Sequence, residues 1–305
     1  MFVVALCIPR AWHQPHGDVT TPLVLVCAYL LVRALHLGAY AVAARDDPGL
    51  RHQLWVTLIP LLLGAALMVP GAIIGGWAQT VLYAAALAAD WSGVYITSRG
   101  GGWRIHSAAH WTERHGNFII LAIGESVVAI GVGAGSQAVR GPLIVAATLG
   151  VAVAVGMWWL YFDVVALTAE RRFLQAQGQD RVKLAIEAYT YGHFPIVAGI
   201  VIAALGVRGV LGRAEQTARL GAFYASALFG GIALYLLGHV LFKQLMGNGR
   251  SVPRLVTAGV ALAALPVAIY LPPLGGLGLI VVILTALISV ETRRYSDLRS
   301  TLRAH

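Results

Sequence analysis

Ionisable side chains inside apolar segments are the residues of this sequence best placed to do chemistry. In the segment 21–44, Tyr29, Arg33, His36 and Tyr40 follow a spacing of four, three and four. This spacing places them along one face of a helix. A charged group in a membrane span costs about 2.5–3.5 kcal/mol on insertion scales, so it usually faces a cavity or a partner. The segment therefore predicts a polar stripe directed into a helix bundle.

Two other segments carry similar polar stripes. The segment 77–97 contains Gln79, Tyr83, Asp90 and Thr97, and a later segment contains Tyr235, His239 and Lys243 at successive spacings of four. Three stripes favour a hydrophilic region inside the bundle. The alternative is three separate hydrogen bonds between packed helices, because polar contacts also hold membrane helices together.

The most distinctive local pattern is HWTERHGNFIILAIGESVVAIG, His110 to Gly131. An interfacial cluster of His110, Glu113, Arg114 and His115 stands where this helix would enter the membrane. Glu125 lies inside the helix, about 18 Å beyond Glu113 at 1.5 Å per residue. A buried carboxyl with a tunable pKa suits proton or cation binding. The alternative is a purely structural hydrogen-bonded pair.

Neither a metal nor a nucleotide cofactor is expected. The spacing of His110, Glu113 and His115 differs from HExxH and implies no closed set of ligands. The glycine-rich run 131–136 ends an apolar helix and follows no strand, so it lacks the context of a dinucleotide-binding loop.

Two further places combine titratable groups with unusual surroundings. Asp163 follows the aromatic run 158–162, where it could also serve as an interfacial anchor. Tyr191 and His193 precede Pro195, which leaves the carbonyl of Tyr191 without its helical donor. We expect a kink there. Irregular backbone beside a titratable group is common in transport sites, and it is an equally common way to bend a helix.

The composition requires a membrane as the surrounding medium. The chain has 305 residues, of which 58% are hydrophobic and 11% charged, and its mean hydropathy is +0.76. These values predict an all-α, polytopic membrane bundle, a single transmembrane domain over 1–305. Nine spans are expected: 21–44, 54–76, 77–97, 116–135, 142–168, 185–206, 221–245, 254–271 and 274–290.

The distribution of basic residues predicts the orientation. Most lysines and arginines fall in 45–53, 98–115, 169–184, 243–254 and the tail 291–305, and few fall in the alternate loops. The positive-inside rule makes the first set cytoplasmic, including the C-terminus. The net charge of +9 thus sits in short loops, which predicts attraction to anionic lipids and no nucleic-acid partner. The two cysteines, Cys7 and Cys27, lie in apolar stretches and are expected to be packing residues.

An internal repeat is suggested at an offset of 203 residues. It pairs His36 with His239, Arg51 with Arg254 and Pro70 with Pro273. Both copies would begin on the outer side, as in transporters with parallel repeats. The first copy would be 21–97, the central motif helix 98–141, and the second copy with its preceding helices 142–290. The apolar stretch 1–9 is interpreted as the tail of a helix whose beginning is missing.

The ERHG and GES elements of the central motif, about ten residues apart, resemble the bacterial low temperature requirement A (LtrA) family. The segment Tyr191-Gly192-His193 and the pair Gly238-His239 are also similar to that family, and 159–164 is similar to the family's opening motif. The resemblance implies a bacterial inner-membrane protein named for a growth requirement in the cold. It supplies no established molecular activity.

Three functions are compatible with these residues. The first is a secondary transporter or ion-coupled carrier for a small solute or proton, with Glu125 and Asp90 as proton or cation sites and Arg33, His36, His193 and His239 as relay or anion partners. The second is a membrane enzyme acting on a lipid or polyprenyl substrate through the interfacial cluster. The third is a sensor or assembly protein without turnover. The residues leave the oligomeric state open.

Overall fold

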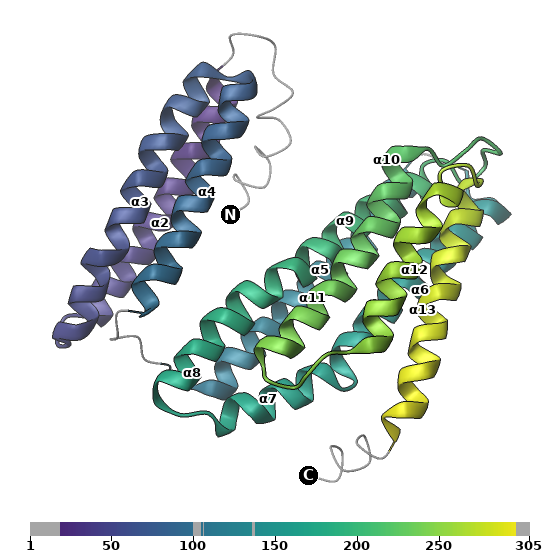
Figure 1. Cartoon of the computed structure of the whole chain (residues 1–305). Coiled ribbons are helices and arrows are strands. Elements are labelled where there is room, and N and C mark those ends of the chain that lie inside the picture. The colour runs from purple at the N-terminus through teal and green to yellow at the C-terminus, as the bar shows by residue number, and fades with distance from the viewer. Residues whose placement is uncertain (1–18, 100–104, 106, 136–137, 297–305) are drawn as a thin grey trace. The chain divides into compact units, whose positions relative to one another are not determined.

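The computed structural model describes residues 19–99, 105, 107–135 and 138–296, and within them every regular element is a helix (Figure 1). The expectation of an all-α protein is confirmed. The chain divides into two compact units, Met1–Arg104 and Ile105–His305. The single transmembrane domain over 1–305 stays a prediction.

The described residues of unit 1 form three helices, α2 (Thr20–Ala43), α3 (Pro48–Ile74) and α4 (Gly76–Arg99). Asp47 caps α3 by accepting hydrogen bonds from the backbone nitrogens of Gly49 and Leu50 at 2.9 and 3.2 Å, and Pro48 occupies the first turn, where no N–H is needed. The chain reverses at Gly75, whose φ of +72° suits glycine. The cap and the reversal thus define both ends of α3 and lay α4 against it.

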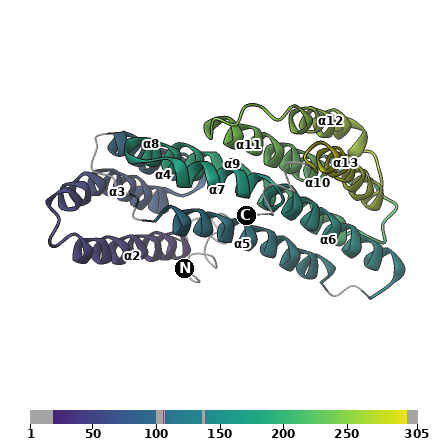
Figure 2. The same ribbon diagram turned by 90° about the horizontal axis from the view of Figure 1, so that it is seen from below.

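The described residues of unit 2 form nine α-helices and two π-helices. In chain order these are α5 (Ala108–Ala134), α6 (Gly141–Phe162), α7 (Val165–Gln175), α8 (Gly178–Leu184), the π-helix η1 (Ala185–Gly192), α9 (His193–Leu211), α10 (Ala222–Ala225), the π-helix η2 (Ser226–Gly230), α11 (Gly231–Leu245), α12 (Val252–Ala268) and α13 (Pro273–Arg294). Figure 2 shows α12 and α13 side by side next to α11.

Helices α9 and α11 form the closest pair of unit 2. A Cβ added at Gly238 would lie 2.8 Å from the backbone nitrogen of Ile196, and one at Gly199 would meet the backbone of Tyr235. Glycines at these positions let the two backbones approach each other, as in other membrane helix pairs. This contact fixes the position of His239, which follows Gly238 directly.

The irregular backbone expected before Pro195 is present. The π-helix η1 occupies Ala185–Gly192, directly before α9, and the Thr190 hydroxyl donates to the carbonyl of Ala185 at 3.0 Å. Such π segments widen the helical turn and often occur at functional sites. Here the segment brings Tyr189 and His193 into the core, where both are buried.

Seven of the described helical segments are long and apolar enough to cross a membrane. The expected spans 77–97 and 254–271 are helical, as α4 and α12, but do not belong to these seven. Helix α12 has 17 residues, or about 25 Å at 1.5 Å per residue, which is shorter than a hydrocarbon core of roughly 30 Å. Helix α4 is interrupted by polar residues such as Thr80, Asp90 and Ser92. The count of nine is therefore not confirmed.

The internal repeat is not confirmed either, because paired positions occupy different surroundings. Arg51 is exposed whereas Arg254 is buried. Pro70 lies inside α3, whereas Pro273 starts α13. Helix α13 also continues through Glu291 to Arg294, so the tail expected to begin at 291 starts with a helical turn.

Candidate functional site

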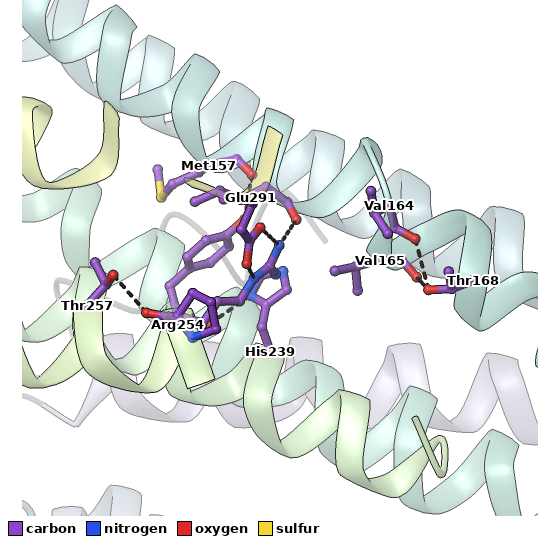
Figure 3. A network of polar contacts seen from close by, with 11 residues as sticks. Met157, Val164, Val165, Thr168, His239, Arg254, Thr257 and Glu291 are labelled. Carbon is purple, nitrogen blue, oxygen red and sulfur yellow. Dashed lines mark hydrogen bonds and ion pairs between the residues drawn. The ribbon is translucent and has the colours of Figure 1, made fainter. Parts of the chain in front are cut away.

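A buried ion pair joins the last two helices of unit 2. The Arg254 guanidinium donates through Nε to Glu291 Oε1 at 2.8 Å and through Nη2 to Glu291 Oε2 at 2.7 Å. Nη2 also donates to the carbonyl of Leu160, at the end of α6, at 2.8 Å. The two side chains are only 5% and 8% exposed. This two-pronged pair ties α6, α12 and α13 together (Figure 3).

His239 lies beside this pair and has a defined tautomer. Its Nδ1 is 2.8 Å from the carbonyl oxygen of Tyr235, one helical turn earlier. Because a carbonyl only accepts, Nδ1 must carry the hydrogen, and in the neutral ring Nε2 is then an acceptor. The hydroxyl of Tyr235 in turn donates to the carbonyl of Met157 (Figure 3).

A cavity of about 270 Å³ opens next to His239 and Arg254. Its charged lining residues are Lys243, Arg254 and Glu291, and its polar ones include Thr168, Asn248, Ser251 and Tyr295. Val164, Val165, Phe242 and Met246 supply apolar wall. The lining comes from the start of α7, the end of α11, the turn into α12 and the end of α13, so the cavity belongs to one end of unit 2. We call it the α11–α13 cavity.

Three residues that line the α11–α13 cavity each carry a buried polar atom with no hydrogen-bond partner among the described residues. These atoms are His239 Nε2, Ser251 Oγ and Arg254 Nη1, and their residues are at most 4% exposed. An unsatisfied buried polar group costs about 1–3 kcal/mol. All three atoms belong to residues that line the same cavity.

A cluster of aromatic and histidine rings lies beside the cavity. The Tyr161 hydroxyl is 2.8 Å from His193 Nε2, and the Tyr161 ring lies 5.9 Å from the ring of His239. The ring of His115 lies 5.2 Å from that of His193 and 5.2 Å from that of Tyr189. Three histidines predicted from separate segments thus meet in one part of the core.

Unit 1 has its own ion pair. Arg33 of α2 donates through Nη2 to Asp90 Oδ1 of α4 at 2.6 Å, and both side chains are partly exposed. Asp90, Tyr29 and Tyr83 line a smaller cavity of about 160 Å³. The structure therefore brings the first two predicted stripes together, although His36 of the first stripe is exposed on unit 1.

The predicted interfacial cluster divides between two environments. His110 and Glu113 are exposed, with a contact of 3.9 Å between Nδ1 and Oε2, and Arg114 is exposed as well. His115 instead turns inward, where its Nδ1 donates to the carbonyl of Trp111 at 2.8 Å. Successive residues of a helix point about 100° apart, which separates Arg114 from His115.

The remaining predicted residues are not among those that line the α11–α13 cavity. Glu125 is exposed on unit 2, whereas its neighbour Ser126 is buried and donates to the carbonyl of Ala122 at 3.2 Å. Asp163 is partly buried at the junction of α6 and α7, and Tyr191 is partly buried in η1. Of the cysteines, Cys27 is a free, exposed thiol, and Cys7 lies outside the described residues.

Sequence reasoning missed three members of the site: Glu291, Ser251 and Tyr161. The sequence pattern places Glu291 in the tail, and it places Arg254 in a basic loop and in the repeat. The available signal was an arginine near the start of one apolar segment and a glutamate at the end of the next. In an up-and-down pair of helices, such residues lie at the same end of the bundle.

Comparison with known proteins gives the family. Residues 1–289 match the family model of the bacterial low temperature requirement A protein, LtrA. A Rhizobium meliloti (strain 1021) protein with the name "Uncharacterized protein RA0937" is 30% identical over 155 residues, which cover 50% of this chain and 36% of that protein. The match therefore spans little more than a third of that relative's length. No solved structure matches the chain. Because the family match extends over most of its length, the chain belongs to the bacterial low temperature requirement A family.

Proposed function

We propose that this protein is a secondary transporter or ion-coupled carrier and that the α11–α13 cavity is its solute site. The observation that supports this function is the set of three unpartnered polar atoms around a cavity within an apolar helical unit. Polar groups inside membrane spans are costly and usually mark substrate or ion pathways. A purely structural bundle would gain stability by pairing these atoms or replacing them with apolar groups.

The ring cluster supplies groups that can relay a proton to the cavity. His193 and Tyr161 are within hydrogen-bond distance at 2.8 Å, and a hydroxyl and an imidazole can each donate and accept. His115 contacts His193 on one side, and Tyr161 contacts His239 on the other. In this proposal the histidines couple proton movement to occupation of the cavity.

The other ionisable residues are assigned to the ion pathway as part of the same proposal. Arg33 and Asp90 form a pair that protonation of the carboxylate would weaken. Glu125, His36, Asp163 and Tyr191 are the remaining candidates, each on or near an apolar helix.

The orientation follows from the basic loops. All lining residues of the cavity come from the end of unit 2 that carries Lys243, Arg250, Arg293 and Arg294. With these residues on the cytoplasmic side, the protein is a multi-pass protein of the bacterial inner membrane with a cytoplasmic C-terminus. The cavity then opens toward the cytoplasm, and the basic residues around it attract anionic lipids.

Transport by purified protein in liposomes tests this function. Radiolabelled lactate, succinate, alanine, glucose and rubidium would be offered singly under an imposed pH gradient, with an internal pH dye to follow protons. We expect at least one solute to accumulate above protein-free liposomes and an ionophore to abolish the accumulation. Glu125→Gln tests the ion pathway and should reduce the proton signal. Absence of solute accumulation and of proton movement in folded protein would contradict the carrier function.

The two other functions give different results in that experiment. A membrane enzyme would change the lipid composition of the liposomes, which mass spectrometry of the extracted lipids would detect. An assembly protein would show neither flux nor product and would retain partners after gentle solubilisation. A changed lipid composition without flux would favour the enzyme over the carrier, and retained partners without flux would favour the assembly protein.

A further inference from the structure

We propose that the α11–α13 cavity binds a small hydroxy-carboxylate, with the carboxylate at Arg254 and Ser251 and the hydroxyl at His239. This assignment rests on the proposed carrier function, because it names the solute class of the same site. It is derived from the charge of the cavity, the hydrogen-bonding capacity of its unpartnered atoms and the character of its walls.

The charge of the cavity matches a monoanion. Its charged lining residues are Lys243, Arg254 and Glu291, which leave one positive charge in excess. Lys243 is half-buried, with its ammonium 5.6 Å from the centre of the Tyr295 ring. In a poorly solvated site an excess cation attracts an anion more strongly than it would in water. One carboxylate would neutralise the cavity.

The start of α12 adds to this attraction. Ser251 is the N-cap residue of α12, yet its side chain makes no capping hydrogen bond. An N-cap serine ordinarily satisfies a backbone N–H of the first turn. Here the buried hydroxyl has no partner among the described residues, and Ser251 is one of the residues that line the cavity. The helix N-terminus carries a partial positive charge that favours an anion beside it.

The three unpartnered atoms specify more than an anion. Arg254 Nη1 can only donate, and the Ser251 hydroxyl can donate, so both suit carboxylate oxygens. Neutral His239 presents Nε2 as an acceptor, because its Nδ1 hydrogen is directed to the carbonyl of Tyr235. An acceptor requires a donor on the ligand. A carboxylate that also carries a hydroxyl supplies both kinds of group.

The size and walls of the cavity limit the rest of the ligand. A volume of about 270 Å³ far exceeds that of one water, about 30 Å³ in the liquid. Apolar side chains, including Val165 and Phe242, form part of the lining. The cavity therefore suits a compact acid with a short apolar body, of which lactate is the simplest probe.

Competition binding tests the ligand class directly. The protein would be placed in nanodiscs of phosphatidylcholine, which carries no net charge, and binding of radiolabelled L-lactate measured by scintillation proximity. Unlabelled propionate lacks the hydroxyl, and lactamide lacks the charge. We expect each to compete about tenfold or more weakly than lactate, the effect of one lost hydrogen bond or ionic contact in a buried site. The assignment would be overturned if unlabelled lactate, propionate and lactamide competed equally well, or if lactate did not bind.

Two serine variants localise the binding. Ser251→Ala removes the unpartnered hydroxyl and should weaken lactate about tenfold. Because that hydroxyl caps no helix and is buried without a partner among the described residues, the unfolding temperature should not fall. Ser289→Ala is the matched control, since Ser289 is exposed on α13 and its hydroxyl bonds only the carbonyl of Thr285 within the helix. Equal affinities for lactate in the two variants would overturn the placement at Ser251.

An oxyanion with a nearby hydroxyl can also come from a lipid headgroup. The measurement is therefore repeated in nanodiscs of phosphatidylglycerol, whose headgroup has a phosphate and hydroxyls. Unchanged lactate affinity supports a free solute, and loss of lactate binding would assign the cavity to the headgroup and overturn the solute. Lactate binding without any flux would contradict the carrier function alone. Flux of another solute without lactate binding would contradict the ligand class alone.

Discussion

The Arg254–Glu291 pair provides the sharpest test of how unit 2 is held together. Glu291→Leu removes both carboxylate contacts, at 2.8 and 2.7 Å, and leaves the guanidinium buried with the Leu160 carbonyl as its remaining acceptor. Breaking a buried pair by removing one partner costs about 3–5 kcal/mol, because the other charge stays unpaired. We expect the free energy of unfolding to fall by about that amount.

A double-mutant cycle measures the pairing. The variants would be unfolded by titration with SDS and followed by tryptophan fluorescence. Arg254→Met alone should also destabilise, and the combination Arg254→Met with Glu291→Leu should recover most of the loss, because apolar residues of similar size often replace a buried pair at little cost. A double variant as unstable as the sum of both single variants would refute the reasoning.

The pair in unit 1 is the internal comparison. Arg33 and Asp90 share one contact at 2.6 Å, and their side chains are 25% and 18% exposed. Partial access to the surroundings reduces the cost of leaving one partner alone. Asp90→Leu should therefore destabilise less than Glu291→Leu, and an equal or larger loss would contradict the assigned role of burial.

Three further predictions concern packing, the ring cluster and orientation. Gly238→Ala places a Cβ 2.8 Å from the backbone nitrogen of Ile196 and should lower the free energy of unfolding by about 1–3 kcal/mol in the same SDS titration. Gly278→Ala lies inside α13, where a Cβ meets nothing within 4 Å, and should raise it by about 0.5–1 kcal/mol, the gain of alanine over glycine in a helix. Tyr161→Phe removes the 2.8 Å contact with His193 Nε2 and should cost about 1–3 kcal/mol, and an unchanged unfolding curve would argue against that hydrogen bond. A C-terminal green fluorescent protein fusion should fluoresce and an alkaline phosphatase fusion should be inactive, since both report a cytoplasmic C-terminus; the reverse pattern would contradict the proposed orientation.

The helices could be predicted because each apolar run must satisfy its backbone groups internally within a membrane. Pro195 also predicted irregular backbone next to His193, and η1 lies there. The number of membrane spans was harder to predict from the sequence. Helix α4 is long enough to span a membrane, but its polar residues make it less apolar than the seven candidate spans. Helix α12 is apolar, but it ends after 17 residues.

The site was only partly accessible from the sequence, because its members meet through packing. His193 and His239 were recognised as polar residues in apolar spans, and His115 as part of the interfacial cluster. Their proximity depends on the glycines that draw α9 and α11 together, such as Gly238. The positions of Arg254 and Glu291 in their segments place them at the same end of the bundle, but their direct pairing depends on how α12 and α13 align. Whether the Glu125 side chain is exposed or buried depends likewise on which side of α5 packs against other helices.

Uptake of lactate into proteoliposomes, compared between two lysine variants, tests the central claim most directly. Lys243 lines the α11–α13 cavity, whereas Lys183 is exposed on α8 and does not. We predict that the unaltered protein and Lys183→Met take up lactate under an inward proton gradient and that Lys243→Met loses most of this uptake while keeping the same unfolding temperature. Equal uptake by the two lysine variants would contradict the claim that this cavity is the solute site.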